Sequence, residues 1–64
     1  MTDQQEKIYN LIITSIANDG YAMSNLKIAS QLGKHRQVID KDVNLLVAMG
    51  KLKKLKPGLI VMPE

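Results

Sequence analysis

The stretch NLKIASQLGKHRQVIDKDVNLLVAMG, residues 25–50, contains two runs of helical periodicity separated by a single glycine and one or two further residues. Apolar residues of the first run recur mainly on one side of a helix, at Leu26, Ile28, Ala29 and Leu32. Gly33 suits the left-handed backbone conformation that often closes a helix. The spacing predicts a helix over 24–32.

The second run has the same spacing at Ile39, Val43 and Leu46, flanked by Val38, Leu45 and Met49. It stops at Gly50, which predicts a helix over 35–49. We expect the aliphatic stripes, together with Met23 and Met49, to form the core. Two short helices joined by so tight a turn form a helix-turn-helix unit, in which the second helix is held out from the body of the domain.

The N-terminal segment predicts another helix, over 3–18. Thr2 and Gln5 have the spacing of a capping box, which satisfies two backbone donors at a helix start. Asn18-Asp19-Gly20 provides the stop. The following YAMS, residues 21–24, is short enough to be a minimal strand before Ser24 caps the next helix.

KLKKLKPGL, residues 51–59, follows a helix that has already ended, and Pro57-Gly58 suits the centre of a type II turn. We therefore expect a hairpin over 51–62. Strand side chains alternate, so the three-residue spacing of Leu52 and Leu55 predicts a bulge or one exposed leucine. Membrane binding of KLKKLK, residues 51–56, is disfavoured, because six residues bury too little apolar surface to anchor a chain.

The expected fold class is mainly α with a small β-hairpin: one domain over 1–64, with three helices and a two- to three-stranded antiparallel sheet. A chain of 64 residues is near the lower limit for a self-sufficient core. It contains no Cys and one His, so no nucleophile, base and orienting group can be assembled, and we expect neither an enzyme nor a metal or other cofactor site. No signal peptide or apolar run of membrane-spanning length is recognisable, which favours a cytoplasmic protein.

The positive charge is concentrated in the second half of the chain. Residues 1–33 carry a net charge of −1, and residues 34–56 carry seven basic side chains against two acidic ones, a net charge of +5. Such asymmetry within one small domain suggests a face for an anionic partner, and nucleic acid is the commonest one.

The order of helix, tiny strand, helix-turn-helix and hairpin looks like a winged helix. The segments TDQQEKIYNLI, KIASQLG and LVAMGKL resemble the corresponding parts of the DNA-binding domain of LexA-type repressors, at Thr2, Gln5, Ile8, Tyr9, Ile28, Ala29, Leu32, Gly33, Leu46, Gly50 and Leu52. The turn after Gly33 looks one residue shorter than in that family, and from these 64 residues we expect the Ser/Lys self-cleavage and dimerisation domain to be absent. The resemblance therefore implies a stand-alone DNA-binding module or a fragment, associated with the nucleoid.

In a winged helix the exposed face of the third helix enters the major groove. The candidate base-contacting residues are His35, Arg36, Gln37, Asp40, Lys41 and Asn44. Arg36 can pair with guanine and Gln37 with adenine. Two interpretations of Asp40 and Asp42 stay open: a carboxylate accepts from a cytosine amino group, or both are surface charges paired with Lys41 or solvent.

Phosphate contacts are expected from the ends of the second helix and from the wing, at Ser24, Asn25, Lys27, Lys34, Lys53, Lys54 and Lys56. The alternative for the wing lysines is ordinary solvation of a sheet edge, which lysine protects from pairing.

The final strand LIVM has apolar residues on both of its faces, at Leu59, Ile60, Val61 and Met62. Only one face can cover the core, so we expect the other to meet a second surface, with a homodimer as the leading explanation. Two functions follow. The first is a sequence-specific regulator that binds double-stranded DNA, and the second is a protein-interaction winged helix that docks on a protein partner through the third helix or the terminal strand.

Overall fold

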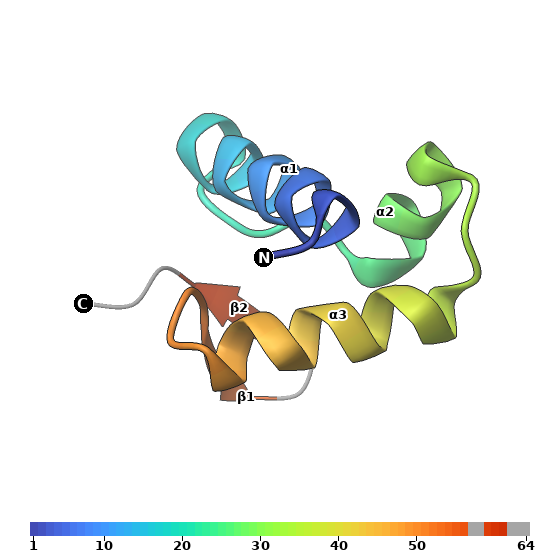
Figure 1. Cartoon of the computed structure of the whole chain (residues 1–64). Helices are drawn as coiled ribbons and strands as arrows, with labels where there is room; N and C mark the ends of the chain where they lie inside the picture. Colours follow the sequence, from blue (N-terminus) through green and yellow to red (C-terminus); the bar gives the residue numbers. More distant parts are fainter. Residues whose placement is uncertain (57–58, 62–64) are drawn as a thin grey trace.

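The structure, a computed structural model, describes residues 1–56 and 59–61. Its elements follow the order α1 (Asp3–Asp19), α2 (Asn25–Leu32), α3 (Arg36–Ala48), β1 (Lys53–Lys56) and β2 (Leu59–Val61). In Figure 1, α1 lies above α3, α2 lies near the N-terminal end of α3, and the hairpin follows its C-terminal end. The expected mainly helical fold with a small antiparallel hairpin is confirmed, and it is consistent with a winged helix.

Side-chain caps fix the beginnings of the first two helices. The backbone N–H of Gln5 donates to Thr2 Oγ1 at 3.1 Å, and the N–H of Thr2 donates to Gln5 Oε1 at 3.0 Å. This is the predicted capping box. At the start of α2, Ser24 Oγ accepts from the N–H of Lys27 at 3.2 Å, as expected for a serine cap.

The turn between α2 and α3 is as tight as the sequence predicts. Gly33 has φ of +66°, the left-handed conformation that favours glycine. Only Gly33, Lys34 and His35 separate the two helices, and His35 makes no side-chain cap hydrogen bond. The direction of α3 is therefore set by this glycine turn and by packing.

The core is aliphatic and receives residues from all three helices and from the hairpin. Within the described residues, its buried members are Ile8, Ile12, Ile28, Ala29, Ile39, Val43, Leu46, Leu52 and Ile60. Polar contacts add to this packing at the edge of the core. Gln4 Nε2 of α1 donates to Asp42 Oδ2 of α3 at 2.7 Å, which ties the N-terminal turn of α1 to α3.

Two residues that the sequence assigned to the core are exposed. Leu26 is 66% exposed and Met49 is 47% exposed. At about 100° per residue, Leu26 lies roughly 110° around α2 from the midpoint of the buried pair Ile28 and Ala29, so it cannot share their face. Met49 follows the end of α3 and lies with the exposed Leu45 beside the buried stripe, not on it. Met23 is partly buried against the core, as expected.

The sheet has two strands among the described residues, and residues 21–24 form no strand. The pairing is antiparallel, with a register shift between Lys54 and Lys56. Leu55 in this shift is 55% exposed and Leu52 is buried, so both features offered for the leucine spacing are present. The expected turn at Pro57-Gly58 and the residue Met62 lie outside the described residues. No helix of the described part is long and apolar enough to cross a membrane.

Replacement of Leu46 by Ala should destabilise the protein by about 2–5 kcal/mol, because Leu46 is fully buried and its loss leaves a cavity. The adjacent Leu45 is 41% exposed, so Leu45→Ala should cost no more than about 1 kcal/mol. Urea unfolding followed by circular dichroism measures both. Equal losses of stability in the two variants would contradict the placement of Leu46 on the buried side and Leu45 on the exposed side of α3.

Candidate nucleic-acid interface

The first turns of α3 present the predicted base-contacting side chains on one side of the helix. At about 100° per residue, Arg36, Gln37, Asp40, Lys41 and Asn44 fall within an arc of roughly 140°. All of them are exposed except Asp40, which is half-buried, and His35, just before the helix, is exposed as well. The core-facing stripe of Ile39, Val43 and Leu46 is centred roughly 120° around the helix from this face, so burial of that stripe turns the polar face toward solvent, with Val43 next to Arg36 at the boundary.

The face borders a groove of about 440 Å³ between the N-terminal end of α2, α3 and the hairpin. Its polar lining consists of Ser24, Asn25, Arg36, Asp40, Asn44 and Lys54. Val43 and Ile60 contribute apolar lining, and Leu26 lies at the groove with most of its side chain exposed. Residues predicted separately as base contacts and as phosphate contacts therefore lie around one concave surface.

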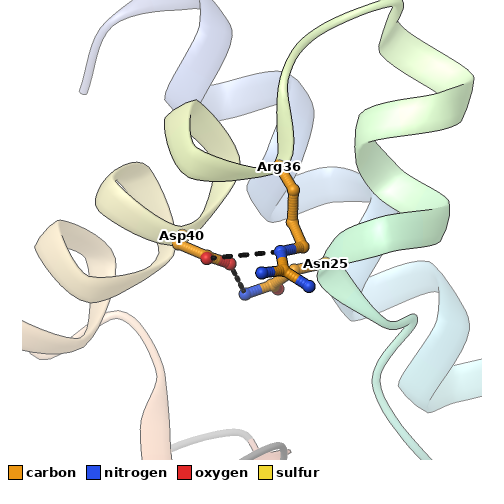
Figure 2. Close-up of polar contacts among 3 residues, drawn as sticks. All are labelled: Asn25, Arg36 and Asp40. Atoms are coloured by element: carbon orange, nitrogen blue, oxygen red, sulfur yellow. Dashed lines mark hydrogen bonds and ion pairs between the residues drawn. The ribbon is translucent and has the colours of Figure 1, made fainter.

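A polar cluster links α2 to the start of α3 within this groove. Asn25 Nδ2 donates to Asp40 Oδ1 at 2.7 Å, and Arg36 Nε lies 3.8 Å from Asp40 Oδ2. Figure 2 shows the carboxylate of Asp40 facing Asn25 on one oxygen and Arg36 on the other. The side chains of Arg36 and Asp40 remain 64% and 43% exposed, so the cluster is accessible from solvent.

The two carboxylates of α3 have different partners. Asp40 pairs with Arg36 one turn earlier, and no ion pair with Lys41 is present among the described residues. Asp42 accepts from Gln4 of α1 on the other flank of the helix. Of the two interpretations left open, base reading stays a prediction, and the surface-charge alternative named Lys41 or solvent as partners, whereas the partners present for Asp40 are Arg36 and Asn25.

The predicted phosphate-contacting residues form two groups beside α3. One group, Ser24, Asn25, Lys27 and Lys34, belongs to α2 and its ends, and the other consists of the lysines of β1. The Ser24 hydroxyl caps α2 and the Asn25 amide donates to Asp40, so both have intramolecular roles as well. The lysines Lys27, Lys34, Lys53 and Lys54 are exposed. The side chain of Lys56 lies outside the described residues, although its backbone belongs to β1.

The sequence interpretation missed the role of Asn25 in holding Asp40, the role of Gln4 in holding Asp42, and the position of Leu26 at the groove. Pairs separated by 15 and 38 residues follow no helical spacing. Only the packing angles of α1 and α2 against α3 bring them together. A short polar side chain at the first position of α2 was nevertheless a usable signal for a contact at that helix end.

No group of three or more His, Cys, Asp or Glu side chains in the described part of the chain is arranged to hold a metal ion. Two comparisons with known proteins address the family: no protein-family model matches the chain, and no curated protein matches it in sequence. The resemblance to LexA-type repressors therefore stays a prediction from the residues quoted above.

Proposed function

We propose that this protein is a small transcriptional regulator that binds double-stranded DNA sequence-specifically and acts as a repressor. In this proposal it is a winged helix of the kind found in LexA-type repressors and acts at the nucleoid in the cytoplasm. The observation that carries the proposal is the exposed polar face at the start of α3, which borders a groove shared with the basic hairpin.

The dimensions and chemistry of this face support insertion in the major groove. That groove admits one α-helix, and the side chains of the N-terminal half of a recognition helix reach the base edges. Arg36 and Gln37 occupy the first two positions of α3 and are exposed. Their terminal groups match guanine and adenine respectively.

The distribution of charge supports phosphate binding around the same face. Lys34 precedes α3, and Lys53 and Lys54 extend from β1, all of them exposed. Lysines that neutralise phosphates release counterions, which supplies affinity without sequence preference. In our proposal the wing fixes the position of the protein and α3 reads the sequence.

The second candidate function is docking on a protein partner, and a specific observation favours it. Val38, Leu45 and Met49 are exposed and follow one side of α3. They lie next to the polar face, so α3 has apolar surface available for a protein. The expected homodimer stays a proposal: Ile60 is buried in the core, which leaves the opposite face of β2, with the half-buried Val61, as its candidate surface, while the side chain of Leu59 lies outside the described residues.

Selection from a random duplex pool, followed by sequencing, tests the first function. We expect a motif to be enriched by the wild-type chain and to be lost in the double variant Arg36→Ala, Gln37→Ala, because each of these contacts is worth about 1–3 kcal/mol of base discrimination. The double variant should unfold at nearly the same urea concentration, since both side chains are exposed. A wild-type chain that enriches no motif would favour the protein-docking function.

The salt dependence of binding tests the role of the wing. Replacement of Lys53 and Lys54 by Ala should reduce the slope of log K against log salt by about 1–2 and weaken binding to all duplexes alike, because each phosphate contact contributes roughly 0.9 to that slope. Fluorescence anisotropy at several salt concentrations gives the slope. Lys7→Ala is the matched control, because Lys7 is exposed on α1 and the groove has no lining residue from that helix. An equal change of slope in the control would contradict the assigned role of the hairpin.

A further inference from the structure

Asp40 occupies an unusual position for a residue at a DNA-binding face. A carboxylate near phosphates opposes binding through charge repulsion, so its presence within the polar face needs a compensating role. Asp40 lies one turn after Arg36 and is half-buried, whereas the other polar residues of the face are exposed. Its two oxygens face two different partners, Asn25 and Arg36.

The hydrogen bond from Asn25 restrains the carboxylate. Its 2.7 Å length is short for an amide donor and is typical of a charged acceptor. Asn25 is the first residue of α2 and is itself half-buried, so its amide is carried by a helix whose start Ser24 caps. The orientation of Asp40 thus depends on the packing of α2 against α3.

The ion pair with Arg36 involves the inner nitrogen of the guanidinium. Arg36 Nε is the atom 3.8 Å from Asp40 Oδ2, and Figure 2 shows the two terminal nitrogens of Arg36 beyond Nε. An ion pair through Nε leaves both terminal N–H₂ groups available for a ligand, and two such donors match the O6 and N7 acceptors of guanine.

We propose that Asp40 is a positioning residue: held by Asn25, it orients Arg36 for recognition of one guanine in the major groove. This inference rests on the proposed function. Asp40 acts on the base through Arg36 and does not read a base itself. An arginine side chain has many rotamers, and a partner that restricts them before binding reduces the ordering that recognition requires.

The inference predicts two effects of opposite sign when the charge of Asp40 is removed. Affinity for non-specific duplexes rises, because a negative charge near the phosphates is lost. Preference for guanine at the base pair that Arg36 reads falls by on the order of 10-fold, which lies within the range of one bidentate contact. A residue that only stabilised the fold would weaken binding to all duplexes.

Asp40→Asn is the suitable variant, because its remaining side-chain oxygen still accepts from Asn25 while its amide cannot pair with Arg36. Asp42→Asn is the matched control. It removes the same charge from the same helix, retains an acceptor for Gln4, and has no arginine partner. Both variants, Arg36→Ala, and the double variant Arg36→Ala, Asp40→Asn are measured against the selected duplex and against its single-base-pair substitutions.

We expect Asp40→Asn to lose preference at the same base pair as Arg36→Ala, and the double variant to lose no more than Arg36→Ala alone. Asp42→Asn should leave the preference at that base pair unchanged. Loss at a different base pair, or additive losses in the double variant, would show that Asp40 reads a base directly and would overturn the inference. Equal loss of preference in Asp42→Asn would also overturn it, because charge alone would then account for the change.

A measurement on the free protein separates this inference from the proposed function. Arg36 is the only arginine of the chain, so its Nε–H gives a single side-chain arginine signal in a ¹⁵N spectrum. We expect slower solvent exchange and a higher order parameter at Nε in the wild-type chain than in Asp40→Asn. Identical Nε signals would overturn the positioning role even if selection yields a motif. If Nε is restrained but the chain selects no motif, the proposed sequence-specific DNA binding would be refuted, and the guanine contact with it.

Discussion

Burial of Ile39, Val43 and Leu46 is the constraint on which the remaining structure depends. These three residues of α3 are 0–2% exposed and contact the aliphatic side chains of α1, α2 and the hairpin. The chain has no Phe or Trp, so many small contacts among branched side chains must fix the rotation of each helix. Once α3 is rotated to bury this stripe, its polar residues necessarily face away from the core.

The two carboxylates of α3 supplement that apolar constraint on either flank. Asp40 accepts from Asn25 of α2 and Asp42 accepts from Gln4 of α1, both at 2.7 Å. Hydrogen bonds to charged acceptors are stronger than those between neutral groups. Since the donors are neutral amides, the negative charge is not cancelled by them. Among the described residues, Arg36 is the only cationic partner of Asp40. The polar face therefore contains a positive and a negative charge that pair with each other, which a sum of its charges does not show.

The helices and the turn were predictable because their signals are local. The capping box at Thr2, the serine cap at Ser24 and the left-handed glycine at Gly33 depend on residues within four positions of one another, and the structure has all three. The rotation of the short helix α2 was less predictable. Leu26 matched the spacing of a buried stripe, but eight residues provide too few positions to decide which side faces the core.

The candidate site was predictable as a set of residues but not as a set of contacts. The charge distribution and the tight turn after Gly33 predicted that the start of α3 and the hairpin form the candidate site. Both regions do line one groove. The partners of Asp40 and Asp42 depend on how α1 and α2 cross α3, which no short-range pattern encodes. The sequence left Asp40 as either a cytosine reader or a surface charge paired with Lys41 or solvent, and it did not predict the cluster that Asp40 forms with Asn25 and Arg36.

Backbone amide shifts of the ¹⁵N-labelled protein, recorded during titration with the selected duplex, test most directly whether α3 and the hairpin form the DNA-binding surface. We expect the largest changes in residues 34–44 and in β1, with small changes along the outer side of α1. Large changes at Asn10, Thr14 and Asn18 of α1, with the start of α3 unperturbed, would contradict the proposal that α3 and the hairpin bind DNA.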